Sequence, residues 1–437
     1  MNSQLYNEIK DILYSELVPA LGCTEPGAIA YAAYQAQKLL NLKPDERIEA
    51  MELWCSSNIV KNVKSVIVPN SGGMRGIEAA AILGASVRLS ENSECELEIL
   101  NYVTESERKI AKELEGTGFC VCHLQEDTPN LYIRVLAKMN SHVAEIIIQD
   151  GHTNIVYKAL DEEVLLDRRN GRGSSEIDEN KDKLSIKTIL EFAEQLNLED
   201  AEDIFKTQKE VNTAIGEEGI KNYYGSRVGQ TLLNSMDKND VRIRAVAKAA
   251  AGSDARMNGC IMPVVINSGS GNQGITVTVP VVEYAKNMNA DDLTLYKALC
   301  ISNLVSIHIK NHIGKLSAFC GAVSAACGSG AAIAYLENES YDVICHTISN
   351  TLANVGGIVC DGAKASCAAK IASSLDAAFL GFDMARRGCY FQSGEGFIED
   401  DIEETIDNMG KIGKYGMKNT DKEIINLMLG HKDYICD

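Results

Sequence analysis

Short motifs for the commonest zinc sites are missing from this chain. Its 437 residues contain no CxxC pair and no HExxH, which removes the simplest zinc fingers and zinc hydrolases. Positive charge is also scarce, because 42 Lys and Arg stand against 61 Asp and Glu and the formal net charge is -19. Nucleic acids and anionic lipids reward clustered Lys and Arg. We therefore expect neither nucleic acid nor a membrane surface as the main partner.

Long, strongly hydrophobic runs are absent as well. The first 18 residues carry Glu8, Asp11 and Glu16 in an amphipathic pattern, without the basic start and apolar run of an export signal. We therefore expect a cytoplasmic protein. Residues 316–336 form a long uncharged stretch, but Ala, Gly, Ser and Cys dominate it. Such weak hydrophobicity favours a buried helix pair over a membrane span.

Cysteine is too sparse, at 14 residues, for a disulfide-stapled miniprotein. In a reducing cytosol these cysteines would be thiols. Each is then a small core residue, a metal ligand or a nucleophile. With 45% hydrophobic residues, the chain is long enough to bury separate cores in two or three domains.

The periodicity of apolar residues changes along the chain. Residues 1–40 predict helix with a break at 19–22, and a charged, turn-rich stretch near 165–183 precedes a mostly helical second half. Between these parts lie short β-type runs, the clearest of which are residues 65–68, 131–135 and 144–148. We therefore predict an α+β N-terminal domain over residues 1–175, followed by a mostly α-helical domain over residues 176–437.

A cysteine stands where a helix is expected to begin. Cys23 precedes Thr24, a good helix cap, and Pro26, which suits a first helical turn. The helix dipole and the free backbone amides at such a position favour a thiolate and lower the pKa of the thiol. Cys23 is therefore a candidate catalytic residue, and a core cysteine is the alternative.

Two loops are candidates for binding a carboxylate. The first is glycine-dense and polar, and its candidate residues are Asn267, Ser268, Gly269, Ser270 and Asn272. Backbone amides exposed by glycines, with short hydroxyl and amide side chains, form a neutral nest suited to an anion. The second loop carries Ser71 and Arg75 after an expected strand that ends near Pro69, and Arg75 can pair with a carboxylate. An ordinary turn is the alternative for each loop.

Four cysteines gather in two glycine-flanked segments of the second half. They are Cys320 and Cys327 in the first segment and Cys360 and Cys367 in the second. Soft thiolates with small neighbours are what an iron-sulfur cluster needs. In a continuous helix the Cα atoms of Cys360 and Cys367 would lie roughly 10 Å apart, so we expect the Asp361-Gly362 step to break the helix. Buried thiols are the alternative.

Four segments, taken in order, carry a resemblance to a known family. They are Cys23-Thr24-Glu25-Pro26, Asn267-Ser268-Gly269, Cys320-Gly321 and Gly356-Gly357-Ile358-Val359-Cys360-Asp361-Gly362. From about Leu5 to about Gly394 the chain resembles the L-cysteine desulfidase family, whose helical half is similar to the α domain of bacterial iron-sulfur L-serine dehydratases.

The resemblance implies a carbon-sulfur lyase. In that family a [4Fe-4S] cluster is held by three cysteines, which fall here on Cys320, Cys360 and Cys367, and Cys327 is left for the core. An iron with three protein ligands keeps an open position and can act as a Lewis acid. The implied reaction is β-elimination of L-cysteine to sulfide, ammonia and pyruvate, without pyridoxal phosphate. Cys23 would lie close to the substrate, either as base for the Cα proton or as a fourth ligand in the resting enzyme.

Rival functions remain open at this point. The same chemistry on L-serine or another β-substituted amino acid would release a different leaving group. A non-catalytic amino-acid or redox sensor would keep the ligands without turnover, although no DNA-binding or signalling module is found. A small amino acid is the expected partner in each case, and a homo-oligomer is left open.

Overall fold

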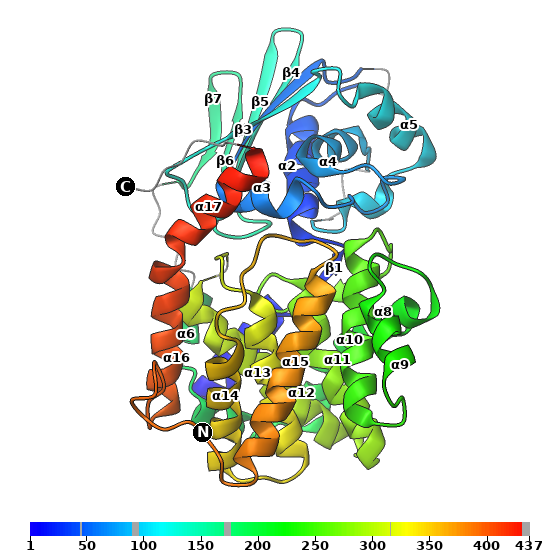
Figure 1. The fold of residues 1–437 in the computed structure, drawn as a ribbon. Helices are drawn as coiled ribbons and strands as arrows, with labels where there is room; N and C mark the ends of the chain where they lie inside the picture. The colour runs from blue at the N-terminus through cyan, green and yellow to red at the C-terminus, as the bar shows by residue number, and fades with distance from the viewer. Residues whose placement is uncertain (44–45, 90–95, 170–175, 315, 431–437) are drawn as a thin grey trace.

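The computed structural model describes residues 1–437 except 44–45, 90–95, 170–175, 315 and 431–437. Its elements form two lobes, one built on a sheet and one made of packed helices (Figure 1). Elements of both lobes line a cavity between them, so the arrangement of each lobe decides which residues reach that cavity.

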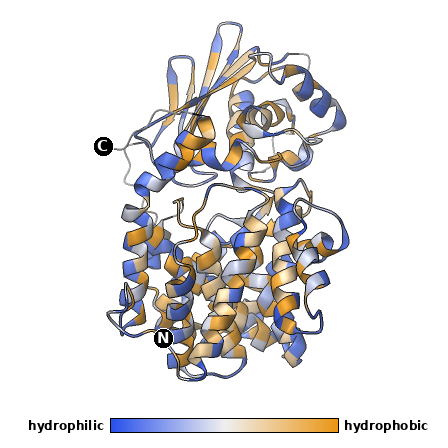
Figure 2. Ribbon diagram, viewed as in Figure 1, coloured by the Kyte–Doolittle hydropathy of each residue, from blue (hydrophilic) through white to orange (hydrophobic). Residues whose placement is uncertain are grey.

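The sheet of the upper lobe has the strand order β3-β2-β4-β5-β6-β7. Neighbouring strands are antiparallel except β2 and β3, which are parallel. Burial alternates along β2 and β4 as expected for a sheet with one covered face, and Figure 2 shows that the sheet carries both apolar and polar residues. The strands are β2 (Ala50–Cys55), β3 (Cys120–Leu124), β4 (Tyr132–Met139), β5 (His142–Gln149), β6 (Ile155–Leu160) and β7 (Glu163–Asp167).

Helices cover the buried face of this sheet. Helix α2 (Thr24–Leu39) packs on β4 and β5 and against α4 (Gly76–Ser86). The two helices approach closely because Gly84 faces the backbone of Ala30, where a Cβ would lie 2.1 Å from the Ala30 carbonyl oxygen. The lobe is completed by α3 (Ser57–Val63), the 3-10 helix η1 (Ile99–Tyr102) and α5 (Glu105–Leu114).

The lower lobe is a bundle of helices around α11, α12 and α13. Apolar residues on these helices are buried against one another, with small residues at close crossings such as Gly328 against the backbone of Ser302. Its helices are α6 (Glu176–Lys181), α7 (Ile186–Gln195), α8 (Leu198–Lys221), α9 (Val228–Ser235), α10 (Val241–Met257), α11 (Gly271–Met288), α12 (Asp292–Ile313), α13 (Gly321–Leu336), α14 (Tyr341–Val355), α15 (Cys367–Ala385), α16 (Ile402–Lys411) and the π-helix η2 (Ile412–Gly416).

Three elements from one half of the sequence pack against elements from the other half. Helix α1 (Ser3–Glu16) packs against α6, and strand β1 (Pro19–Leu21) pairs antiparallel with β8 (Pro263–Val265). Helix α17 (Lys418–Leu429) packs against α3 of the upper lobe, as Figure 1 shows. The mixed N-terminal region and helical C-terminal region agree with the predicted fold class, and the domain boundary at residue 175 stays a prediction.

Local predictions have different outcomes. The helical break at 19–22 is confirmed, with β1 inside it. The strand predicted at 65–68 is wrong: only Ile67 forms a bridge, to Arg75, because the chain turns back at once. Residues 316–336 contain one buried helix, α13, instead of the predicted pair. Within the described residues, no helix is long and apolar enough to span a bilayer.

Candidate active site

Helices α2, α11, α13 and α15 all begin at one cavity between the lobes. Cys23, Ser270 and Cys320 are the N-caps of α2, α11 and α13, and Cys367 is the first residue of α15. These residues line a cavity of about 100 Å³ together with Cys360. Helix N-termini carry partial positive charge and free N–H groups, so their convergence favours negatively charged ligands.

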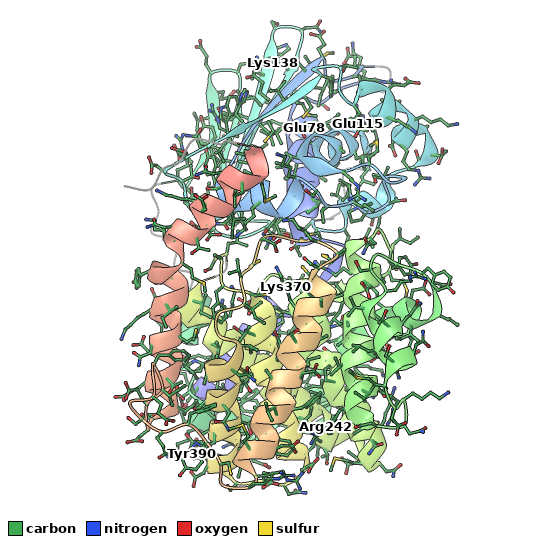
Figure 3. All side chains as sticks on the ribbon, in the orientation of Figure 1. Glu78, Glu115, Lys138, Arg242, Lys370 and Tyr390 are labelled. Carbon is green, nitrogen blue, oxygen red and sulfur yellow. The ribbon has the colours of Figure 1, made fainter. Side chains whose placement is uncertain are left out.

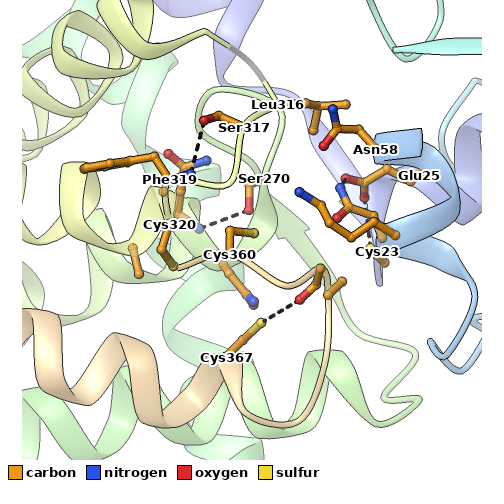
Figure 4. A pocket seen from close by; sticks show the side chains of 18 of the residues that line it. Cys23, Glu25, Asn58, Ser270, Leu316, Ser317, Phe319, Cys320, Cys360 and Cys367 are labelled. Atoms are coloured by element: carbon orange, nitrogen blue, oxygen red, sulfur yellow. Dashed lines mark hydrogen bonds between the residues drawn. The ribbon is translucent and has the colours of Figure 1, made fainter. Parts of the chain in front are cut away.

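The three predicted cluster cysteines share one wall of this cavity. Cys320 and Cys360 are brought together by a bridge between Phe319 and Val359, in which the Cys320 N–H donates to the Ile358 carbonyl at 3.0 Å and the Cys360 N–H to the Ala318 carbonyl at 2.6 Å. Residues 360–366 are not helical, as expected from Asp361-Gly362, and the chain turns Cys367 back toward Cys360. Figure 4 shows Cys320, Cys360 and Cys367 on one side of the pocket.

Cationic side chains stand beside this wall. Burial, with Cys360 nearby, raises the pKa of Cys320 to about 12, whereas Lys370 lowers it. Lys370 lies at the end of α15 that faces the upper lobe (Figure 3) and pairs with Asp361. Burial also raises the pKa of Cys367, against the influence of Lys370 and Arg256. At neutral pH Cys320 and Cys367 are therefore thiols in the metal-free protein, and a bound metal would displace their protons.

The three cysteines suit an iron-sulfur cluster by their donor chemistry, because soft thiolates are the ligands that such clusters bind. Within the described residues, no three His, Cys, Asp or Glu side chains are grouped so that they could hold one metal ion. A polynuclear cluster binds each cysteine through a different iron, so its ligands need not converge on one point. Cys327, by contrast, is fully buried in the apolar core, as the resemblance implied.

A second wall carries Cys23 and Glu25, and Cys367 packs against the small cluster that Cys23 forms with Val66 and Met257. The Cys23 thiol donates to Glu25 Oε2 at 2.9 Å, Thr24 Oγ1 donates to the same oxygen at 3.0 Å, and Asn62 Nδ2 donates to Oε1 at 2.7 Å. Burial alone would raise the pKa of Glu25, but nearby His152 and the hydrogen bond from Cys23 lower it. Glu25 is therefore a buried carboxylate held by Cys23 and Asn62, while Thr24 Oγ1 shares its one proton between Glu25 and the Gly269 carbonyl.

The predicted pKa of Cys23 is wrong in direction. Cys23 does cap α2, but burial and the adjacent Glu25 carboxylate raise its pKa well above the usual value. Desolvation of a thiolate in this buried site, together with the neighbouring negative charge, outweighs the favourable helix N-terminus. Cys23 is a protonated thiol in the folded protein.

Cations also line the cavity. Lys61 of α3 pairs with Asp421 of α17 at 2.5 Å. Lys310 of α12 is buried, and burial lowers its pKa to about 8. Arg256, near the end of α10, is 4% exposed. In the part of the chain that the structure describes, neither Lys310 nor Arg256 forms an ion pair with a carboxylate. Two buried cations of this kind are suited to an anionic ligand.

Several buried polar atoms at this cavity have no hydrogen-bond partner among the residues that the structure describes. They are Asn58 Oδ1, Asn62 Oδ1, Arg256 Nε, Asn272 Oδ1 and Gln273 Oε1. A buried polar group left unpaired costs about 1–3 kcal/mol, so native structures contain few of them. Their concentration in one cavity indicates a place for a polar ligand.

Only some of the predicted residues of the glycine-rich loop line the cavity. Ser270 and Asn272 line the cavity, whereas the Asn267 side chain is buried and bonded to Asn303 and Ser306. Ser268 lines a neighbouring cavity that shares Lys310. The Gly269 carbonyl accepts from Thr24 Oγ1 at 2.9 Å. Asn267, Ser268 and Gly269 therefore do not line the cysteine cavity, because the tight turn that caps α11 directs them elsewhere.

The second predicted loop does not reach this cavity. Ser71 Oγ donates to the Met74 carbonyl at 3.2 Å, and Arg75 Nη1 donates to the Ser65 carbonyl at 2.8 Å. Neither residue lines the cavity. The structure therefore has the alternative, an ordinary turn before α4 with an exposed Arg75. Both side chains form hydrogen bonds within this turn.

Sequence reasoning missed most of the polar lining. Asn58, Lys61, Asn62, Arg256 and Lys310 stand on helices where each could equally belong to a solvated face, and only the packing of the lobes buries them. Glu25 could have been found from the sequence, because it directly follows the expected helix start at Cys23-Thr24. The sequence indicates Gln273 more weakly, by its place in the first helical turn after the glycine-rich loop.

Comparisons with known proteins identify relatives of this chain. The sequence model of the family described as serine dehydratase alpha chain matches residues 94–426. A UPF0597 protein of Lachnoclostridium phytofermentans is 46% identical over 431 residues, covering 97% of this chain and 100% of that protein. UPF0597 proteins of Desulfitobacterium hafniense and Treponema denticola are 45% and 42% identical, each covering at least 97% of both chains. The similarity spans both walls of the cavity.

Proposed function

The chain belongs to the serine dehydratase alpha-chain family, and we propose that it is an iron-sulfur lyase that converts L-cysteine to sulfide, ammonia and pyruvate without pyridoxal phosphate. One observation carries the proposal. Three cysteines line one wall of a cavity whose remaining lining supplies a buried thiol-carboxylate pair and unpartnered polar atoms. Thiols suited to a cluster and polar groups suited to a substrate thus line one cavity, which supports the proposal.

Cys320, Cys360 and Cys367 would hold a [4Fe-4S] cluster. When bound, it supplies a Lewis-acidic iron with a position open to the substrate. Lys370 and Lys310 near these cysteines would balance the negative charge of three thiolates. The helix N-termini at Cys320 and Cys367 act in the same direction.

The other walls would bind and orient the amino acid. Ser270 and Asn272 at the start of α11, with Arg256, suit the substrate carboxylate. Closure of the cavity by both lobes limits the water around the reacting bonds, which strengthens these polar contacts.

Proton transfer would fall to Cys23 and Glu25. Because Cys23 holds its proton, it can accept the Cα proton only after its own proton passes to Glu25, 2.9 Å away. The pair therefore works as a two-site acid and base. Loss of sulfide leaves aminoacrylate, which tautomerises and hydrolyses to pyruvate and ammonia.

Anaerobic purification with iron and sulfide analysis, followed by assays with L-cysteine and L-serine, tests the proposal. We expect iron and labile sulfide in the protein, and release of sulfide from L-cysteine. Protein that contains a full cluster but releases neither sulfide nor pyruvate would contradict it and would favour a sensor.

L-serine is the second candidate substrate. The description of the matching family names serine dehydratase, and the cavity residues named above would treat the two amino acids alike apart from the leaving group. Release of water from L-serine at a higher kcat/KM than release of sulfide from L-cysteine would make the protein a serine dehydratase.

A further inference from the structure

Helix α3 presents a buried polar face to the cavity. Asn58, Lys61 and Asn62 stand at positions i, i+3 and i+4, which share one side of a helix. They are 6%, 2% and 7% exposed, and all three line the cavity. Lys61 is paired with Asp421, but each of the two asparagines keeps a buried oxygen that has no partner within the described part of the chain. A purely structural helix would bury apolar residues on this face.

The orientation of Asn62 follows from its neighbour. Its Nδ2 donates to Glu25 Oε1 at 2.7 Å, and an ionised carboxylate can only accept. The unpartnered atom is therefore the carbonyl oxygen Oδ1. Figure 4 shows Asn58 beside Glu25 on the side of the pocket away from the cluster cysteines. Two amide oxygens and a carboxylate form a group of acceptors, which suits a ligand with several donors and a positive charge.

Arg256 offers the opposite chemistry. Its side chain lies over Gly271, the first residue of α11, where a Cβ would stand 2.3 Å from Nε. Gly271 thus makes room for the guanidinium at a helix N-terminus. Among the described residues, neither the buried Arg256 Nε nor Asn272 Oδ1, next along α11, has a hydrogen-bond partner. A guanidinium at a helix start suits a carboxylate.

We infer that the cavity separates the two charges of an α-amino acid, with the ammonium held by Asn58, Asn62 and Glu25 and the carboxylate by Arg256. This inference rests on the proposed function, and it names the residues that select an α-amino acid over an α-hydroxy acid. A hydroxyl has one donor and no charge, so it leaves acceptors of this group unpaired.

Calorimetric titration of the anaerobic, iron-loaded protein with L-alanine and L-lactate tests the inference. Both ligands lack a leaving group, so binding is measured without turnover. The intact protein should bind L-alanine more tightly. Asn58→Ala should weaken L-alanine by about tenfold or more, the loss expected for a hydrogen bond to a charged group, and leave L-lactate unchanged. Asn58→Asp keeps an acceptor and should retain L-alanine. Arg256→Gln should weaken both ligands.

Three outcomes would overturn the inference. In the first, Asn58→Ala weakens both ligands equally. In the second, Asn58→Asp loses L-alanine as fully as Asn58→Ala. In the third, the intact protein prefers L-lactate or binds neither ligand. The proposed function fails separately, if the iron-loaded protein binds L-alanine as described but neither L-cysteine nor L-serine is consumed. Sulfide release with no selectivity for L-alanine would refute the inference alone.

Discussion

Cys320 and Cys23 occupy the same local position in different walls of one cavity. Each is the N-cap of a helix, each is buried, and burial raises the pKa of each thiol. Their neighbours differ: Cys320 stands near other cysteines and Lys370, whereas the Cys23 thiol donates to the Glu25 carboxylate. The role of a cysteine at a helix start is therefore decided by the charges around it, beyond the helix dipole itself.

The largest effect is expected on the cluster wall. Cys360→Ala removes a proposed iron ligand, so the iron, the visible absorption and turnover should disappear together. Cys327→Ala is the matched control, because Cys327 lies in the apolar core of the same lobe. Metal analysis and sulfide assays of the anaerobic proteins check both. Iron retained in Cys360→Ala at the level of the control would break the assignment.

Glu25→Gln should give the next largest effect, on the other wall. The amide keeps the size of the side chain but cannot take the proton of Cys23, so turnover should fall roughly a hundredfold, the scale of acid-base catalysis. Iron content should stay normal, because Glu25 is not a proposed ligand. Steady-state kinetics and metal analysis measure the two. Normal turnover in this variant would remove Glu25 from proton transfer.

The pH dependence of Cys23 alkylation tests the electrostatic difference directly. Burial and Glu25 raise the pKa of Cys23 above the usual thiol value of 9.0. The thiol is therefore protonated at neutral pH, and its alkylation by iodoacetamide should be slow and should rise only in strongly alkaline solution. Glu25→Gln removes the second cause. The pKa should then fall and alkylation at a fixed pH should become faster, as peptide mass spectrometry of cluster-free protein can follow. If Glu25→Gln left the alkylation rate unchanged, burial alone would account for the raised pKa of Cys23.

A smaller effect concerns the contact between the walls. Gly362 has φ +97°, and a Cβ there would lie 2.3 Å from the Lys61 carbonyl oxygen of α3. Gly362→Ala should therefore lower the free energy of unfolding by roughly 1–3 kcal/mol. Gly357→Ala is the control, since a Cβ at Gly357 would have nothing within 4 Å and its φ is not positive. Thermal unfolding compares them, and equal Tm values would deny that the walls meet tightly at Gly362.

The sequence predicted local structure correctly where that structure depends on residues of a single segment. The start of α2 at Cys23, the turn before α11 and the non-helical link from Cys360 to Cys367 follow from caps, glycines and the Asp361-Gly362 step. Prediction failed where a property depends on packing between segments that are distant in the sequence. The pKa of Cys23 depends on burial by both lobes, and the proposed binding face of Asn58 and Asn62 exists only because α3 is covered. Arg75 was misplaced because its own turn uses it.

The iron content of Cys23→Ala, purified without oxygen, tests most directly whether the two walls divide the work. If the cluster belongs to Cys320, Cys360 and Cys367 and Cys23 acts on the substrate, this variant keeps most of its iron while turnover falls by about a hundredfold or more. If it loses its iron as completely as Cys360→Ala, Cys23 is a resting ligand that substrate must displace, and the division between the walls is wrong.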